Sequence, residues 1–353
     1  MTTTAAAHAL ALGQDEKERR LLPELEALVQ SHHRRCEPYA RILAATGQPT
    51  HGYAHLADVP WLPVRMFKHH KLSSIADADV ARVLTSSGTT GEPSRIYLDR
   101  AASATQTREL GRTLRAVLPP ERLPMLLVES RTVVGDGQSY SARGAGALGL
   151  IMFGRDHVWL LDEHGQPDLD ALKRFLDRHG GAPFLIFGFT FMVWLFLYEA
   201  AKGLDLSHGI LIHSGGWKRL VERAVDNAEF RRRLLADTGL RRVHNFYGMV
   251  EQLGTVFLEG PSGNDLYCPD FADVVIRDPL TFAELPPGQP GLIEVVSTLP
   301  TSYPGNAVLT EDLGIVHGTD DGDWPGKRFT VLGRLARAEA RGCSDTFTRA
   351  GDA

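Results

Sequence analysis

The segment TSSGTTGEPS, Thr85 to Ser94, carries six hydroxyl side chains around two glycines. Gly88 and Gly91 have no Cβ, so both can adopt left-handed torsions and turn successive backbone N–H groups toward a common point. Such a loop suits an anion, and phosphate is the leading candidate. The segment lacks the lysine of the P-loop pattern G-x-x-x-x-G-K-[ST], so it indicates a different kind of phosphate loop. A flexible surface loop is the alternative interpretation.

Two glycine-containing motifs follow predicted strands farther along the chain. The first, HSGGWK, supplies Ser214, Gly215, Gly216 and Trp217. The second, FYGMVEQ, supplies Tyr247, Gly248 and Glu251. Taken alone, the first motif is also typical of a tight strand-to-helix turn, and Glu251 is also typical of a helix N-terminus.

The phosphate-loop candidate and these two motifs together resemble the signatures of adenylate-forming enzymes, which activate a carboxylic acid with ATP to give an acyl adenylate and pyrophosphate. The resemblance implies that the Gly-Gly turn lines the adenine pocket, that Tyr247 packs on adenine, and that Glu251 holds Mg²⁺ against the phosphates. It also implies that Asp312 in LTEDLG binds the ribose hydroxyls and that Arg334 is the Gly-Arg near the end of the large domain.

The resemblance assigns phosphate binding to the hydroxyl-rich segment, Thr85 to Ser94. Its expected members are Ser86, Ser87, Gly88, Thr89, Thr90 and Gly91. Arg95 stands where many relatives have a lysine, so it either takes over a phosphate charge or faces solvent. Glu251, Thr89 and Thr90 are therefore expected to act in the adenylation step.

A narrower resemblance is to the LuxE-type acyl-protein synthetases of bacterial luminescence systems. Its motifs span about residue 55 to the C-terminus and are VPWLPVRMFKHHKLSS, SSGTTG, HSGGWK, FYGMVEQ and RGCSDTF. The family has the large adenylating domain without the usual separate C-terminal domain. A cysteine near the C-terminus accepts the acyl group in this family, and Cys343 in RGCSDTF matches it. Thiolate is the competent nucleophile, and Arg341 would favour it electrostatically.

The other two cysteines, Cys36 and Cys268, have no comparable sequence context and are expected to be packing residues. An unremarkable cysteine in the tail is the alternative for Cys343. The substrate is expected to be a fatty or aryl acid, because the run around Phe187, Phe189 and Phe191 could form the wall of an apolar pocket. A plain hydrophobic core is the alternative interpretation of this run.

Strand and helix patterns alternate from about residue 95 to residue 247, which predicts an α/β fold with a largely parallel sheet. A helical arm is expected at 1–50, with leucines at helical spacing from Asp15 to Thr46, as a lid or a packing arm. The adenylating large domain is expected at 51–335, with interlocked subdomains and a β-rich module at about 255–335. A short tail carrying Cys343 would occupy 336–353. One helix is predicted from the sequence DLDALKRFLDRHG, with Asp168 as its N-cap. A second helix is predicted from the sequence WKRLVERAVDNAEFRRRLLADTG.

Composition limits the partners. The chain has 353 residues and a formal net charge of -5, which gives no global attraction to nucleic acid or acidic membranes. The longest apolar run, 184–198, is too short to span a bilayer. The three dispersed cysteines and the lack of a secretion signal predict a cytoplasmic protein.

Function is therefore expected to be Mg-ATP-dependent acyl adenylation, transfer to Cys343, and delivery to an acyl reductase partner. One alternative is a ligase that passes the acyl group to coenzyme A or a carrier protein. Another is a non-catalytic, nucleotide-binding scaffold subunit. The sequence leaves open the identity of the acid, the final acceptor, the oligomeric state, the pathway and any movement of the tail.

Overall fold

The computed structural model describes residues 8–86, 93–134, 142–217 and 224–335. The chain divides into two compact units, each assembled from separate stretches of sequence. Unit 1 comprises Met1–Ala116, Gly248–Leu258 and Asp265–Glu339, and unit 2 comprises Val117–Tyr247, Glu259–Asn264 and Ala340–Ala353. Strand β9 (Phe257–Glu259) lies where the chain passes from one unit to the other. Among the described residues, no helix is both long enough and apolar enough to cross a bilayer.

Unit 1 contains an antiparallel sheet with the order β11-β12-β13-β14-β10. The strands are β10 (Leu266–Tyr267), β11 (Ala272–Arg277), β12 (Gly291–Ser297), β13 (Ala307–Thr319) and β14 (Lys327–Arg334). Short β1 (Leu62–Pro63) pairs in parallel with β13. These strands confirm the strand-rich pattern predicted beyond residue 255.

Helices α1 (Gln14–Arg35) and α2 (Glu37–Thr46) confirm the helical start of the chain, with a break at Cys36. Leu21, Leu25 and Val29 of α1 are fully buried in the core of unit 1, which also includes Val275 of β11 and Val308 of β13. Hydrophobic residues at helical spacing therefore pack α1 as a structural arm of this unit.

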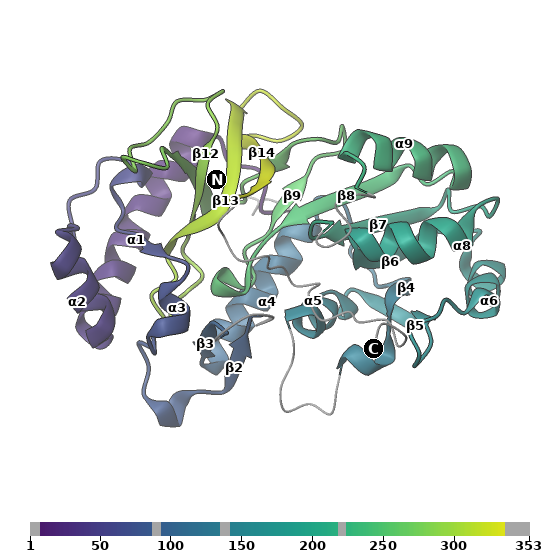
Figure 1. Ribbon diagram of the computed structural model, residues 1–353, viewed down its shortest axis with the longest axis horizontal. Coiled ribbons are helices and arrows are strands. Elements are labelled where there is room, and N and C mark those ends of the chain that lie inside the picture. Colours follow the sequence, from purple (N-terminus) through teal and green to yellow (C-terminus); the bar gives the residue numbers. More distant parts are fainter. Residues whose placement is uncertain (1–7, 87–92, 135–141, 218–223, 336–353) are drawn as a thin grey trace, which may run out of the picture. The chain divides into compact units, whose positions relative to one another are not determined.

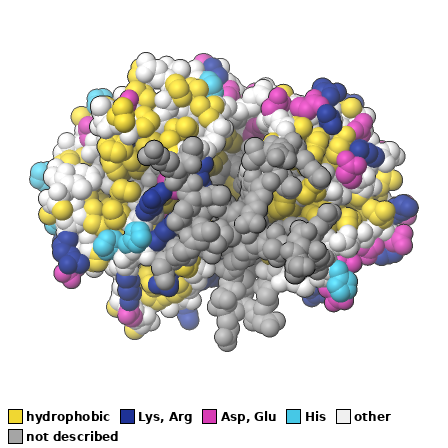
Figure 2. All heavy atoms as spheres, in the orientation of Figure 1, with side chains coloured by type: hydrophobic (Ala, Val, Ile, Leu, Met, Phe, Trp, Pro, Cys, Tyr) yellow, Lys and Arg dark blue, Asp and Glu magenta, His cyan; other side chains and the backbone are white. Residues whose placement is uncertain are grey.

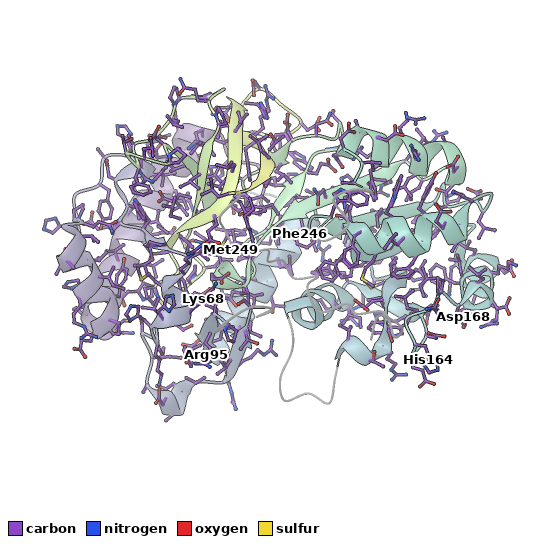
Figure 3. The ribbon with its side chains drawn as sticks, in the orientation of Figure 1. Lys68, Arg95, His164, Asp168, Phe246 and Met249 are labelled. Atoms are coloured by element: carbon purple, nitrogen blue, oxygen red, sulfur yellow. The ribbon has the colours of Figure 1, made fainter. Side chains whose placement is uncertain are left out.

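The hydroxyl-rich segment joins two strands of a small hairpin in unit 1. β2 (Arg82–Thr85) pairs antiparallel with β3 (Arg95–Leu98), and the connecting loop falls mostly outside the described residues. α4 (Arg100–Leu114) follows, with the Asp99 side chain accepting a hydrogen bond from Ala102 N as its N-cap. The short helix α3 (Met66–His69) packs against β3, and Figure 3 labels Lys68 of α3 and Arg95 of β3.

Unit 2 is a parallel α/β unit, as the alternating pattern predicts, and its strand order is β8-β7-β6-β4-β5. Its strands are β4 (Leu123–Ser130), β5 (Gly154–Leu161), β6 (Phe184–Phe189), β7 (Gly209–Ser214) and β8 (Arg242–Tyr247), and its helices are α5 (Ala142–Ile151), α6 (Leu169–His179), α7 (Thr190–Met192), α8 (Glu199–Ala201) and α9 (Asn227–Thr238) (Figure 1). A π-helical segment, Val193–Tyr198, joins α7 to α8.

The helices of unit 2 cover both faces of its sheet. Phe175 of α6 contacts Phe184 of β6, and Phe230 of α9 contacts His213 of β7, whereas α5 approaches Phe189 of β6. Phe184 and His213 lie at positions of the same parity, and Phe189 has the opposite parity. Because alternate residues of a strand point to opposite faces, α6 and α9 cover one face and α5 covers the other.

The predicted N-cap of α6 is confirmed, since the Asp168 side chain accepts from Ala171 N at 2.8 Å (Figure 3). The single helix predicted from Trp217 onward is wrong in its continuity, because residues 224–226 are not helical and α9 begins at Asn227, while 218–223 lie outside the described residues. Asp226 accepts a hydrogen bond from Glu229 N at 2.7 Å, so an N-cap inside the predicted helix sets its true beginning.

Candidate active site

The hairpin of unit 1 presents the base of the candidate phosphate loop. Ser86 N donates to Ser94 O at 3.1 Å, and Ser94 N donates to Ser86 Oγ at 2.9 Å. The Ser86 hydroxyl, expected to bind phosphate, therefore accepts a hydrogen bond at the base of the loop. The predicted loop residues Ser87, Gly88, Thr89, Thr90 and Gly91 lie outside the described residues.

Glu251 lies in a short 3-10 turn, Val250–Gln252, and its side chain is buried with 6% exposure. Burial raises the pKa of its carboxyl above the usual range; the Ser94 hydroxyl and the Arg334 charge oppose this rise, and the nearby Asp312 charge adds to it. Glu251, Asp312, Arg334 and Ser94 thus act on one another within unit 1. These four residues come from three distant parts of the sequence, near residues 94, 251 and 312–334, and only the fold brings them together.

Hydrogen bonds from the Gln252 side chain fix the turn that carries Glu251. The Gln252 side chain donates from Nε2 to Val295 O at 2.9 Å and to Gly305 O at 2.7 Å. A Cβ on Gly305 would lie 2.4 Å from the Tyr303 ring and 2.8 Å from Glu251 O. Glycine at position 305 is therefore what allows this close approach.

Asp312 and Arg334 form an ion pair across β13 and β14, where they are register partners. Arg334 Nε donates to Asp312 Oδ1 at 3.0 Å. The adjacent Glu311 forms a second ion pair with Arg65, which stands just before α3. The segment VPWLPVRMFKHHKLSS thus reaches β13 through β1 and Arg65, a connection that sequence analysis did not predict.

In unit 2, the predicted adenine-pocket residues stand at the carboxyl ends of parallel strands. Ser214 ends β7, Gly215 adopts a positive φ of 84°, and a Cβ on Gly216 would have open space around it. Tyr247 ends β8, where Figure 3 labels its neighbour Phe246, and Gly248 and Met249 belong to unit 1. Carboxyl ends of strands are where open α/β sheets bind their ligands.

Trp217, the last residue of the first motif, belongs to an aromatic cluster in unit 2. Its ring lies 5.8 Å from that of Trp194, which stacks on Tyr198 at 4.6 Å and approaches Phe230 of α9 at 5.8 Å. This cluster ties the Ser-Gly-Gly turn to the π-helical segment. The residues offered as an apolar pocket wall are all buried, and they are Phe187, Phe189, Phe191 and Met192.

Two cysteines lie inside the described part of the chain. Cys36 and Cys268 are both buried, and burial raises the pKa of both thiols, for Cys268 to about 12. Such thiols stay protonated near neutral pH and are poor nucleophiles. Cys343, the predicted acyl acceptor, lies outside the described residues.

Charges of both signs occur on the visible face of the molecule (Figure 2). Within the described residues, no group of three or more His, Cys, Asp or Glu side chains is arranged to hold a metal ion. His32, which is followed directly by His33 in the sequence, is buried, with Nδ1 2.8 Å from Ser74 Oγ and Nε2 3.0 Å from Pro300 O. Burial lowers its pKa to about 4, so this ring is a neutral packing group.

A family model and two similar proteins point to the same protein family. The family model described as "Acyl-protein synthetase, LuxE" matches residues 3–350. The "Long-chain-fatty-acid–luciferin-component ligase" of Vibrio harveyi is 26% identical over 320 residues, covering 84% of this chain and 79% of the relative. The protein of the same description from Aliivibrio fischeri is 25% identical over 340 residues, covering 89% of this chain and 84% of the relative.

Solved structures show the same fold. A crystal structure of 2-hydroxyisobutyryl-CoA ligase in complex with 2-HIB-AMP and CoA superposes with a TM-score of 0.73 at 16% identity, covering 96% of this chain and 75% of that chain. ATP-bound MatB from Rhodopseudomonas palustris matches with a TM-score of 0.51 at 20% identity, covering 74% of this chain and 49% of that chain. The fold is therefore that of adenylate-forming ligases.

Proposed function

This chain belongs to the LuxE family of acyl-protein synthetases, and we propose that it activates a long-chain fatty acid with ATP and then carries the acyl group on Cys343. The observation that supports adenylation best is the grouping of Glu251, Asp312 and Arg334 beside Ser94 at the base of the hydroxyl-rich loop. The two curated relatives, both described as long-chain fatty acid ligases, support the substrate class.

Magnesium fits the Glu251 position on chemical grounds. Mg²⁺ prefers oxygen ligands and is usually held by one or two carboxylates together with substrate phosphates. Burial makes ionised Glu251 costly in the protein alone, and a bound cation would reverse that cost. When bound, Mg²⁺ would neutralise the charge on the phosphate oxygens.

The first half-reaction is an in-line displacement at phosphorus. A carboxylate oxygen of the fatty acid forms a bond to the α-phosphorus, the bond from that phosphorus to the bridging oxygen breaks, and pyrophosphate leaves with the electron pair. Asp312 is assigned to the ribose hydroxyls, with Arg334 holding its carboxylate in place at 3.0 Å. The protein contributes positioning and charge neutralisation.

In the second half-reaction, the Cys343 thiolate attacks the acyl carbonyl, the bond from that carbonyl to the phosphate oxygen breaks, and AMP leaves. The burial and raised pKa of Cys36 and Cys268 support this choice of cysteine. The thioester would then pass to an acyl reductase, the partner expected from the resemblance.

Intact mass spectrometry after incubation with Mg-ATP and a pool of fatty and aryl acids tests the proposal. We expect a hydroxylamine-labile acyl adduct on the wild type, on Cys36→Ala and on Cys268→Ala, and no adduct on Cys343→Ala. The adduct mass would also identify the acid.

Acid-dependent pyrophosphate release without any adduct would remove Cys343 from the mechanism. Addition of coenzyme A to the same reaction would then test for a soluble acceptor, because acyl-CoA would accumulate. Neither adduct nor pyrophosphate with any acid of the pool would contradict the adenylation proposal itself.

A further inference from the structure

A buried glutamate in unit 2 gathers four hydrogen-bond donors. Glu259, the last residue of β9, is 1% exposed. Its Oε2 accepts from Asn245 N at 2.9 Å and from Arg231 Nη1 at 3.1 Å. Its Oε1 accepts from Asn264 N at 2.9 Å and from the Asn227 side chain. Four donors on two oxygens match the acceptor capacity of an ionised carboxylate, so this buried group is fully satisfied.

The cation of this cluster, Arg231 of α9, is largely buried as well. Its side chain is 19% exposed, and it donates to Val243 O and, from Nη2, to Pro261 O at 3.2 Å. A Cβ on Gly263 would lie 2.8 Å from Arg231 Nε, so glycine at this position leaves room for the guanidinium. The planar fork of the arginine therefore reaches a carboxylate and two carbonyls at once.

The two side chains bond to β8 in the pattern of a neighbouring parallel strand. In a parallel ladder, one residue donates to the carbonyl before its partner residue and accepts from the N–H after it. Arg231 donates to Val243 O. Glu259 accepts from Asn245 N, two residues farther along β8. These two backbone groups flank His244, so the ion pair takes the place of one residue of a further strand.

This substitution acts at the carboxyl end of β8. Asn245 N lies two residues before Tyr247, which is assigned to the adenine pocket, and an unpaired buried N–H there would be costly. The same carboxylate binds the side chain of Asn227, the first residue of α9. Glu259 therefore joins the end of β8 to the start of the helix that follows the Gly-Gly turn.

We infer that the Arg231–Glu259 pair is a positioning element for nucleotide binding, which fixes the backbone of β8 that carries Tyr247. A backbone that is already ordered does not have to be ordered when the nucleotide binds, which improves affinity. Neither residue is assigned a contact with ATP, so both act through β8. This inference rests on the proposed adenylating function.

Hydrogen–deuterium exchange of the full chain, measured by mass spectrometry, tests the pair without any catalytic readout. In Glu259→Gln, one oxygen becomes an NH₂ group that faces two donors whichever way the amide is turned. We expect the peptide covering 242–247 to exchange about 5-fold faster or more, with peptides of β4 and β5 unchanged. Arg231→Lys keeps the charge but loses the fork, so it should give a smaller increase in the same peptide.

The matched control for exchange is Arg232→Gln, which changes the next arginine of α9. Arg232 is 65% exposed and pairs with Glu229 on the surface, so the exchange of 242–247 should not change. Exchange of this peptide equal to wild type in both Glu259→Gln and Arg231→Lys would overturn the inference. An increase spread equally over β4 to β8 would also overturn it, because the pair would then be a general stabiliser.

Isothermal titration with Mg-ATP, without any acid, tests the link to nucleotide binding. At a temperature where every variant is folded, Glu259→Gln should raise Kd for ATP about 5-fold or more, and Arg231→Lys should raise it less. Asp273→Asn, which removes a buried carboxylate of unit 1, should lose stability and keep the wild-type Kd. An unchanged Kd in Glu259→Gln would refute the positioning role, and Arg231→Lys provides the test if Glu259→Gln does not fold.

The two proposals fail in different ways. A wild type that binds ATP but releases no pyrophosphate with any acid contradicts the proposed function, whereas exchange and ATP binding still test the pair. Normal pyrophosphate release with unchanged exchange and unchanged Kd in the variants contradicts only the inference about Arg231 and Glu259.

Discussion

Glu251 is a buried carboxyl whose ionised form is proposed to hold Mg²⁺ but destabilises the folded protein. Its carboxyl is buried in unit 1, and burial raises its pKa despite Ser94 and Arg334 nearby. A raised folded pKa means that the residue favours folding when protonated, and that this benefit is lost as pH rises from the unfolded value of about 4.3. The ionised form of Glu251 is therefore destabilising in the folded protein.

Glu251→Gln is expected to raise the unfolding temperature by about 1–3 °C at pH 7.5, because the buried charge is removed. The same change should lower the rate of pyrophosphate release by about 10²-fold or more. Differential scanning fluorimetry and a pyrophosphate assay measure the two effects. The exposed Glu163→Gln serves as the control, with neither effect, and a destabilised but active Glu251→Gln would contradict the assignment.

Gly305 sets how closely the Glu251 turn approaches the strands. Gly305→Ala would bring a Cβ within 2.4 Å of the Tyr303 ring and 2.8 Å of Glu251 O. We expect a loss of about 1–3 kcal/mol in the free energy of unfolding, together with reduced adenylation, measured by urea unfolding and pyrophosphate release. Gly181→Ala, where a Cβ meets nothing within 4 Å, should be neutral in both; equal behaviour of the two variants would refute the packing argument.

At the scale of elements, α1 is fastened to the β-rich part of unit 1 by a buried charge cluster. Lys17 Nζ lies 3.2 Å from Asp273 Oδ2, Lys327 Nζ lies 3.5 Å from Asp273 Oδ1, and Gln14 Nε2 donates to Asp273 Oδ2 at 2.6 Å. Burial alone would raise the pKa of Asp273, but the two lysines outweigh it and hold the pKa at about 2. The cluster therefore stabilises the protein above the unfolded pKa of about 4 and is lost as pH falls toward 2.

Asp273→Asn leaves two buried or nearly buried ammonium groups without their carboxylate, so we expect a loss of about 3–5 kcal/mol. Urea unfolding at pH 7 measures it, and hydrogen exchange should show α1 opening first. Glu24→Gln, which changes an exposed acid on the same helix, should stay within about 0.5 kcal/mol. A loss that small for Asp273→Asn would show that the cluster contributes little net stability.

At the scale of the whole molecule, the chain returns to each unit more than once. Unit 1 uses Met1–Ala116 together with two later stretches, Gly248–Leu258 and Asp265–Glu339. Its core joins Leu25 and Leu43 of the helical arm to Val250, Val296 and Val308. The first stretch cannot bury its hydrophobic residues without the later ones.

We therefore expect a fragment ending at residue 116 to lack a cooperative unfolding transition by circular dichroism, since much of its hydrophobic core is missing. The full chain supplies the positive control. A sharp thermal transition of the isolated fragment would show that the helical arm and hairpin fold independently of the β-rich strands.

The sequence by itself determined the elements whose signals are local. Local patterns predicted the largely parallel sheet of unit 2, the N-cap Asp168 and the strand-rich end of unit 1, because periodicity and capping depend on neighbours a few residues apart. The motifs also predicted the family and the adenylate-forming fold. The start of α9 was missed because a second N-cap signal, Asp226, lay inside an apparently continuous helical pattern.

Only the tertiary structure decided which side chains meet. Arg334 faces Asp312 through antiparallel register, Glu251 lies beside Ser94 although the loop and the turn are far apart in sequence, and His213 contacts Thr190 across two strands. None of these contacts has a local signature, because strand order and register are set by burial of the whole sheet. Residue types therefore indicated the chemistry, whereas the neighbours that set the pKa and orientation of each side chain could not be predicted from the sequence.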